Sequence, residues 1–590
     1  MALEVNPHVT RLRRFQPFQP DSAELIYEQS DPNEQMYEMR ALAYISEVLA
    51  DPTVRLLILT GDAGHGKTTL CARLLMGFGM TAREAADAIN ARGDASTPVA
   101  QTGDGRSVWL QKDLSDLTDV GGDQATPVLR RLLNLPDGNV GIVCANEGRL
   151  RAAVSQDDSL ELAVITKTLE LGITDGSVSG VSPTVHVLNL NYQSVAPEGH
   201  EGLVDWAFKT WAVDGRRWTI CNRCNAKSIC PILDNHEALS DRAQGSRRLD
   251  AVRELFSTTE RAGAVVTTRQ ALALVAHAVT GGLACPDVHR HSNRSPTDMS
   301  WQYPYLYHQA LFGDVLSKQQ RRQVPPFEKL RSLDPAKVAN RFVDDTLDPV
   351  EARANFLPPT PSLEDGTPRS RRDAQRESDA IRQLIAFLRR LTYFDAEINQ
   401  RIERMGLRAG RHFVATTKEG RGTSVKVRDT LLRGLEAVQG VYRRSDVPDF
   451  LVLDPAFLSN RSRAAVIALK LTGRDALLVS QKEHWKQDLE STPRLPTTLD
   501  WSSRFVVLRL GAEDSSVALD LDLMRFELLF RWAEGLSSRV QHEPEIRSIT
   551  ATLAALVPEG SSSHEIDILV GTERHTLTID VGDQIRSGGV

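Results

Sequence analysis

Short apolar runs alternate with helical patterns over residues 51 to 196. The run Arg55–Thr60 has the length of a buried strand, and a glycine-rich loop and an amphipathic helical pattern follow it. Three further strands are predicted at Ser107–Gln111, Val140–Ala145 and Thr184–Leu190. The second is continuously apolar, as is typical of a parallel strand covered on both faces. The alternation predicts an α/β fold with a parallel sheet and helices on both faces.

Helical patterns dominate on both sides of this region. Thr267 and Gln270 have the spacing of a capping box, which predicts a helix through Val279 that ends at the pair Gly281-Gly282. Strands are predicted again near the C-terminus, at Asp449–Leu453, Ala476–Ser480, Phe505–Leu510 and Ile566–Leu569. The expected organisation is lead-in helices (1–50), an α/β core (51–196), a helical lid with a cysteine cluster (197–356), a Pro/Gly/Ser-rich linker with an amphipathic helix (357–404) and a C-terminal α+β region (405–590).

Composition narrows the class of protein. The 590 residues include 70 basic and 77 acidic side chains, so the net charge is -7 and nucleic-acid contact is expected only from a local patch. The basic, polar N-terminus lacks the apolar core of a signal peptide, and no apolar stretch has the length of a membrane span. Six cysteines are too few for a disulfide scaffold. We therefore expect a cytoplasmic protein without membrane association.

The glycine-rich loop carries the strongest chemical signal. Gly61-Asp62-Ala63-Gly64-His65-Gly66-Lys67-Thr68 matches G-x-x-x-x-G-K-[ST] at every position, between a strand and a helix. Glycines let consecutive backbone N–H groups point at one anion, and the helix that follows adds the positive end of its dipole. We expect Lys67 to contact the β- and γ-phosphates of ATP, Thr68 to bind Mg²⁺, and Thr69 to adjoin the site. The alternative is a glycine-rich turn that matches by chance.

Hydrolysis needs an acidic residue near the Mg²⁺ site, and three candidates follow strands. Asp113 and Asp116 come after Ser107–Gln111, and Glu147 comes after Val140–Ala145. Each has a second interpretation as a solvated loop charge. Asn146 ends the most apolar strand, where its amide can reach a γ-phosphate or the attacking water, or can cap the next helix. The catalytic candidates are therefore Lys67, Asp113, Asn146 and Glu147.

A cysteine cluster predicts a metal site in the helical lid. Cys221, Cys224 and Cys230 lie within ten residues, and closed structural zinc sites require four ligands. Cys285 or His236 would be the fourth ligand. Unbound thiols are the alternative, whereas thioredoxin-like redox chemistry lacks its strand and helix context. The remaining cysteines, Cys71 and Cys144, are expected to be buried packing residues.

One segment reverses the overall charge. Residues 401–433 contain nine basic and three acidic residues, a net charge of +6. Such a segment can follow a phosphate backbone, which makes DNA a candidate partner. A solvated surface and a docking face for an acidic protein are the alternatives, and only Phe413 offers an aromatic ring for stacking on bases.

The nucleotide core resembles the AAA-type branch of P-loop ATPases, with Asn146 at the position of the sensor asparagine. In that comparison Arg269, on the lid helix, would reach the nucleotide. A narrower resemblance rests on an ordered set of motifs: the loop Gly61–Thr68, VCANEGRL (Val143–Leu150), NLNYQSV (Asn189–Val195), CNRCNAKSICPI (Cys221–Ile232) and TTRQALALVAHAVTGG (Thr267–Gly282). Over about residues 30 to 400, this order is similar to that of the ATPase component of bacterial DNA phosphorothioation-dependent restriction systems.

That resemblance implies an ATPase that powers or licenses a DNA-targeting restriction or antiphage defence complex, with other proteins of the complex or a second copy of the chain as partners. The acidic motif departs from the AAA pattern, because no apolar run ends in Asp-Glu. The second hypothesis is therefore a nucleotide-gated scaffold or signalling ATPase with little or no turnover. A small-molecule kinase is a third, for which the sequence shows no substrate pocket.

Overall fold

The computed structural model divides the chain into two compact units. The first comprises residues 1–260, 264–406 and 491–502, and the second comprises residues 261–263, 407–490 and 503–590. The structure describes residues 5–20, 22, 37–90, 97–114, 117, 125–155, 163, 165–166, 184–294, 300–345, 371–418, 425–441, 449–454, 464–488, 499–511, 516–537, 542–556, 565–570, 573–579 and 585–589. The expected linker 357–368 and Asp116 lie outside the described residues.

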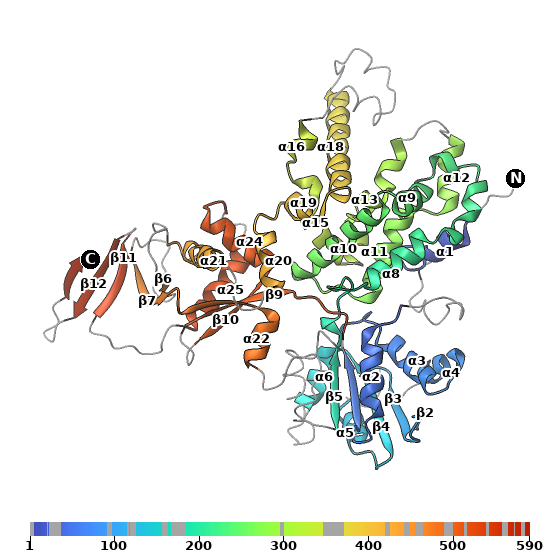
Figure 1. Cartoon of the computed structure of the whole chain (residues 1–590), viewed down its shortest axis with the longest axis horizontal. Helices are drawn as coiled ribbons and strands as arrows, with labels where there is room; N and C mark the ends of the chain where they lie inside the picture. The colour runs from blue at the N-terminus through green and yellow to red at the C-terminus, as the bar shows by residue number, and fades with distance from the viewer. Residues whose placement is uncertain are drawn as a thin grey trace. The chain divides into compact units, whose positions relative to one another are not determined.

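A five-stranded sheet forms the α/β part of the first unit, in the order β2-β3-β4-β1-β5 (Figure 1). Its strands are β1 (Leu56–Thr60), β2 (Ala100–Gln101), β3 (Ser107–Gln111), β4 (Asn139–Ala145) and β5 (Val185–Asn189). β1, β3, β4 and β5 are parallel, as expected, whereas β2 pairs antiparallel with β3. The antiparallel β2 makes the sheet mixed. The sequence pattern does not predict this short edge strand.

Helices flank this sheet. They are α2 (Arg40–Ala50), α3 (Lys67–Gly77), α4 (Ala82–Asn90), α5 (Ala125–Leu133) and α6 (Glu147–Val154). Apolar side chains of α5 and α6 form one core with Leu56 and Ile58 of β1. Because side chains alternate along a strand, Leu57 and Leu59 point to the opposite face. Helices α2, α3 and α4 lie on that side (Figure 1).

The rest of the first unit is helical. Its longer helices are α1 (Pro7–Arg13), α9 (Pro231–Ser240), α10 (Gly245–Arg261), α11 (Thr268–Thr280), α12 (Cys285–Arg294), α15 (Pro326–Ser332), α18 (Arg371–Phe394) and α19 (Ile398–Arg404). Shorter elements are η3 (Leu190–Tyr192), α8 (Leu203–Phe208), η4 (Lys209–Val213), η5 (Gly215–Arg217), η6 (Thr219–Arg223), η7 (Lys227–Ile229), η8 (Ser300–Tyr305), α13 (Tyr307–Ala310), α14 (Lys318–Arg322), η9 (Pro335–Lys337) and α16 (Arg341–Asp344).

Helix α11 is the centre of this helical part. Every residue from Ala271 to Thr280 is buried, and α1, α8, α9 and α13 contact the helix. The predicted capping box is confirmed, since the Thr267 hydroxyl accepts from the Gln270 N–H and the Gln270 side chain accepts from the Thr267 N–H. The helix ends at Gly281, whose φ of 62° is left-handed, as the sequence predicts.

The second unit combines helices with two antiparallel sheets, in the orders β10-β9-β8 and β13-β12-β11-β7-β6. Its strands are β6 (Asp449–Leu453), β7 (Ala464–Thr472), β8 (Ala476–Ser480), β9 (Phe505–Leu510), β10 (Val517–Asp522), β11 (Glu565–Val570), β12 (Glu573–Ile579) and β13 (Ile585–Gly589). Its helices are α20 (Gly410–Lys418), α21 (Val425–Val438), α22 (Gln481–Asp488), α24 (Leu523–Ala533) and α25 (Glu543–Ala554). All four strands predicted for this region are present.

Residues 499–502 are part of the first unit although the chain on both sides of them belongs to the second. The Asp500 carboxylate, 1% exposed, accepts hydrogen bonds from the Tyr37 hydroxyl at 2.7 Å and the Gln193 amide at 2.8 Å. His200 Nε2 lies 2.9 Å from its other oxygen. The Asp500 carbonyl accepts from the Ser194 N–H at 2.6 Å. This short segment thereby fixes the chain that follows β5.

We predict that Asp500→Ala lowers the free energy of unfolding of the first unit by about 3 kcal/mol, because buried donors lose their shared acceptor. Denaturant titration of the full chain measures the change. Asp137→Ala is the matched control, since that carboxylate is 94% exposed and pairs only at the surface with Arg55. Equal stability of the two variants would contradict the prediction.

Candidate functional site

The loop Gly61–Thr68 connects β1 to α3, as the sequence predicts. Gly61, Gly64 and Gly66 have φ values of 137°, 95° and 83°. These values are rarely accessible to residues with a Cβ atom, so the loop shape requires glycine at these positions. Gly66 is the N-cap of α3, and no side chain caps the first turn of that helix. The first N–H groups of the helix are therefore available to an anion.

Lys67 lies over this loop. Its Nζ donates to the carbonyl oxygens of Gly61 at 2.6 Å and Asp62 at 2.9 Å. A lysine has three N–H donors, so one remains for a further acceptor. Burial lowers the pKa of Lys67, while the nearby Cys144, Asp113 and Asp62 raise it. The ammonium group therefore lies among acidic groups in a half-buried position.

Parallel pairing brings the ends of four strands to the same edge of the sheet. Thr60 of β1 is in register with Ala145 of β4 and with Asn189 of β5, and Gln111 of β3 is in register with Val143. The groups that follow these strands therefore lie beside the loop. Within the described part of the chain, the buried Thr60 Oγ1 and Gln111 Oε1 have no hydrogen-bond partner, so polar acceptors remain at this edge.

Glu147 is the centre of a polar network at this edge. Its carboxylate accepts from Arg151 at 2.8 and 3.0 Å, and from the side-chain amides of Asn189 at 3.0 Å and Asn191 at 3.2 Å. Asn191 Oδ1 in turn accepts from the Asp62 N–H at 2.8 Å. The first turn of α6 is thereby connected to the loop Gly61–Thr68 through one side chain, that of Asn191.

The other two predicted catalytic residues have different surroundings. Asn146 is the N-cap of α6, and its Oδ1 accepts from the Gly148 N–H at 3.1 Å, so the capping interpretation describes its oxygen. Asp113 follows β3, and its carbonyl accepts from the Gln111 side chain at 2.9 Å. The Asp113 carboxylate is close enough to raise the pKa of Lys67. Of the three acidic candidates, Asp113 and Glu147 are thus at this edge.

Sequence reasoning did not single out Asn189 and Asn191 as site residues. A partial signal was present, because Asn189 is the next-to-last residue of the predicted strand Thr184–Leu190, and in the structure it ends β5. What the sequence does not contain is the register that puts the end of β5 next to β1. The hydrogen bond from Asp62 to Asn191 depends on that pairing.

The first turn of α11 rests on the loop from the helical side. The Arg269 N–H donates to the Gly64 carbonyl at 3.0 Å, and the Thr268 hydroxyl lies 3.5 Å from the His65 carbonyl. A Cβ atom added to Gly64 would lie 3.0 Å from both Thr267 Oγ1 and Arg269 Cβ. The Arg269 side chain is exposed at this junction.

Two further cysteines contact each other between α3, which follows the loop, and β4. Cys71 of α3 and Cys144 of β4 are buried, and their sulfur atoms are 3.2 Å apart. This agrees with their predicted role as packing residues.

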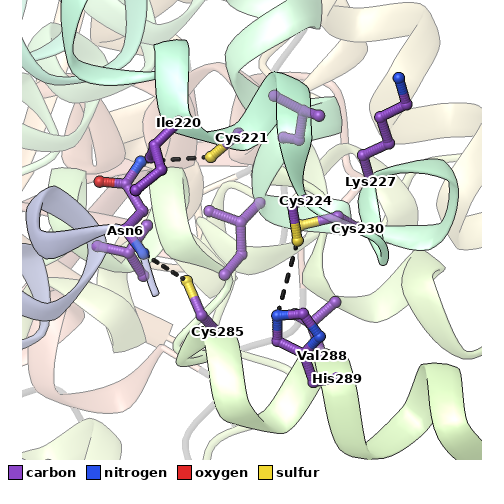
Figure 2. A pocket seen from close by; sticks show the side chains of 12 residues that line it. Asn6, Ile220, Cys221, Cys224, Lys227, Cys230, Cys285, Val288 and His289 are labelled. Carbon is purple, nitrogen blue, oxygen red and sulfur yellow. Dashed lines mark hydrogen bonds between the residues drawn. The ribbon is translucent and has the colours of Figure 1, made fainter. Parts of the chain in front are cut away.

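A second candidate site is a pocket that all four predicted cysteine ligands line (Figure 2). Cys221 and Cys224 come from η6 and its end, Cys230 precedes α9, and Cys285 begins α12. Burial raises the pKa of Cys230 to about 12, and the neighbouring Cys285 and Cys221 add to that shift. Among the residues that the structure describes, no three His, Cys, Asp or Glu side chains already have metal-binding geometry. A zinc site remains a hypothesis at this stage.

The two histidines near this cluster differ. His236, the alternative ligand from the sequence, is not among the pocket residues; it stacks on Trp218 and its Nδ1 lies 2.5 Å from the Ala212 carbonyl oxygen. His289 lines the pocket, and its Nε2 is 3.6 Å from Cys224 Sγ (Figure 2). Sequence spacing draws attention to His236, whereas His289 enters the pocket because it is one helical turn after Cys285.

The basic segment 401–433 is not one uniform surface in its described part. Arg401 is 2% exposed, and it bonds to Glu254 within the first unit. Residues from 407 onward belong to the second unit, where Arg408 pairs with Glu534 and Arg428 with Asp429. Arg401 is therefore unsuited to bind phosphates, and Arg421 lies outside the described residues.

One stretch, Thr268–Arg294, has the length and apolar composition of a membrane span. Its most apolar window is 72% buried inside the protein, and Gly281 and Gly282 separate it into α11 and α12. Most of this apolar window is therefore covered by other parts of the chain, as in a buried core helix.

Comparison of the chain with family models, with curated proteins and with solved structures found no match.

We predict that Gly64→Ala destabilises the contact between the loop and α11. Gly79 is a matched control, because its φ is also 95° but nothing lies within 4 Å of an added Cβ. Both substitutions incur a conformational cost of about 1–2 kcal/mol, and only Gly64→Ala also displaces Thr267 or Arg269. Hydrogen exchange of the amides in the first turn of α11 should therefore accelerate in Gly64→Ala alone. Equal exchange in the two variants would argue against this contact.

Proposed function

We propose that the chain binds Mg²⁺-ATP at the loop Gly61–Thr68 and hydrolyses ATP. The observation that carries this proposal is the loop itself. It combines the complete G-x-x-x-x-G-K-T sequence with three glycines at positive φ and an uncapped helix N-terminus after a buried strand. Backbone N–H groups and one lysine at such a turn are suited to bind a chain of phosphates.

The surrounding residues suit a triphosphate with a divalent ion. Lys67 has one N–H beyond the two that hold the loop carbonyls, and it can direct that donor at a phosphate oxygen. Thr68, on the first helical turn, supplies a hydroxyl to Mg²⁺, which prefers oxygen ligands. When bound, the ion neutralises the charge that develops on the phosphates.

Asp113 is our first candidate for the acidic residue that holds the Mg²⁺ shell. It follows the strand that is separated from β1 by β4 alone, and its charge acts on Lys67. Glu147 is the candidate that orients water, because its carboxylate is at the same edge. Glu147 also helps to position the loop, because it accepts hydrogen bonds from Asn189 and Asn191, and Asn191 accepts one from the Asp62 N–H.

Helix α11 connects this site to the helical part of the unit. The Arg269 backbone is bonded to Gly64, and its exposed side chain begins beside the loop. A bound γ-phosphate would attract this cation. Nucleotide binding would then change the position of α11, and hydrolysis would reverse that change.

For the biological role, we propose that ATP turnover powers or licenses a DNA-targeting defence complex in the cytoplasm. The support is the ordered resemblance of the loop and the later motifs to the ATPase component of phosphorothioation-dependent restriction systems. Basic residues of the second unit, such as Arg411 and Lys418, are the candidate DNA contacts. Stimulation of ATP hydrolysis by double-stranded DNA, and its loss at higher salt, tests this role. Turnover that is indifferent to DNA and to salt would oppose it.

A nucleotide-gated scaffold with little or no turnover is the second candidate. The observation that favours it is that Asn146 and Glu147, the two residues that follow β4, already accept hydrogen bonds within the protein. Arg151 and two asparagines hold the Glu147 carboxylate, and Asn146 Oδ1 caps α6. If these bonds persist with ATP bound, the Glu147 carboxylate cannot orient water, because both of its oxygens are already engaged.

Lys67→Ala should reduce ATP turnover about 100-fold or more, because it removes a charge that stabilises the transferring phosphoryl group. Steady-state phosphate release and fluorescent-nucleotide binding measure the two effects separately. Lys209→Ala is the charge-matched control, since Lys209 pairs at the surface with Glu201. Undiminished turnover and binding in Lys67→Ala would refute the proposed site.

Asp113→Asn and Glu147→Gln discriminate between the two candidates. For an ATPase, we expect each to lower turnover at saturating ATP by about 100-fold while ATP still binds. Arg151→Ala controls for the ion pair, because it frees the Glu147 carboxylate without removing it. Binding by the wild type together with turnover that neither substitution changes would favour the scaffold, and Asp116→Asn would complete the set.

A further inference from the structure

The cysteine pocket collects sulfur atoms from three separate parts of the first unit. Two come from the 3₁₀ turns before residue 225, one from the start of α9 and one from the start of α12. The two cysteines outside the pocket, Cys71 and Cys144, contact each other between α3 and β4 instead. Four of the six cysteines in the chain therefore line one pocket, together with His289 and Lys227 (Figure 2).

N–H groups point at these sulfur atoms. The Asn6 side chain donates to Cys221 Sγ at 3.3 Å, and the Asn6 backbone N–H donates to Cys285 Sγ at 3.4 Å (Figure 2). Cys230 is the N-cap of α9, so the backbone N–H groups that begin this helix follow it directly. A neutral thiol is a weak acceptor, whereas a thiolate accepts charge-assisted hydrogen bonds. The donors thus surround sulfur in the form in which it binds metal.

We propose that Cys221, Cys224, Cys230 and Cys285 bind one structural zinc ion. Four thiolates make a closed tetrahedral site with no open position for a substrate, and the Cys-x-x-Cys pair is a common half of such a site. Zn–S bonds are about 2.3 Å long, so the ion must draw the four sulfur atoms closer than their positions around the pocket. A four-thiolate zinc complex carries a net negative charge, which the N–H donors and Lys227 oppose.

The proposed ion would join segments that surround α11. Asn6 begins α1, which contacts α11; Cys230 begins α9, which also contacts α11; and Cys285 begins α12 just after α11 ends. His289 would donate to the Cys224 thiolate and would not bind the ion. This inference concerns structural support and does not depend on the proposed ATPase activity.

Metal content of the wild-type chain is the first test. After growth with zinc and gel filtration without chelator, mass spectrometry should find one zinc ion per chain. Exchange with Co²⁺ should give the visible absorption of a tetrahedral thiolate complex. Absence of zinc from the chain, even after reduction and reconstitution with Zn²⁺, would overturn the proposal, and so would iron in its place.

Single substitutions test the ligand set. Cys285→Ser should lose the zinc ion, whereas Cys71→Ser and His289→Ala should retain it. Zinc that persists in Cys285→Ser, or that disappears in His289→Ala, would overturn the assignment of four cysteines. The cobalt spectrum of the wild type decides the same question if Cys285→Ser does not fold.

The Asn6 donors have a separate test. Asn6→Ala keeps all four sulfur atoms but removes the side-chain donor to Cys221, so we expect zinc affinity to fall about 10- to 100-fold, as for other outer-shell groups. Competition with a chromophoric chelator measures the affinity. Ser46→Ala is the control, because Ser46 is an exposed residue of α2 whose hydroxyl donates to the Leu42 carbonyl, away from the cysteine pocket. Equal affinity of the two variants would refute the role of Asn6.

Discussion

The packing of the first unit depends on the burial of α11 and on the hydrogen bonds that the N–H groups of its first turn make. Helix α11 is buried from Ala271 to Thr280, and the first N–H groups of a helix have no acceptor within the helix itself. The Thr267–Gln270 capping box and the Gly64 carbonyl accept these hydrogen bonds. The same atoms that complete the helix therefore position the loop, and a side chain at Gly64 would crowd Thr267 and Arg269, since an added Cβ would lie 3.0 Å from both.

The candidate nucleotide site and the cysteine pocket are at opposite ends of this helix in the chain order. The loop contacts its first turn, and Cys285 follows its last. Reactive groups are concentrated at the first end, where Lys67, Asp113 and Glu147 gather. Sulfur ligands and N–H donors are concentrated at the second. In the two proposals, the sheet edge carries the chemistry and the pocket gives structural support.

Local features were predictable from the sequence, and long-range ones were not. Strand β3 and the capping box of α11 follow from short patterns of apolar and capping residues. β2 was not predicted, because two residues contain no periodicity. The hydrogen bonds of Asn191 to the loop and to Glu147 depend on strand register. The packing of α12 decides that Cys285 and His289 line the cysteine pocket and His236 does not. Arg401 seemed part of a basic surface, but its partner Glu254 is distant in sequence.

The insertion of residues 499–502 into the first unit has a consequence for biosynthesis. Domains generally fold from the N-terminus as the chain emerges from the ribosome. Here the Asp500 carboxylate is the partner of Tyr37, Gln193 and His200. It emerges only after residues 407–490 of the second unit, so these three side chains lack this partner until then. The N-terminal part of the chain therefore cannot reach its final packing first, and its maturation during translation is coupled to synthesis of most of the protein.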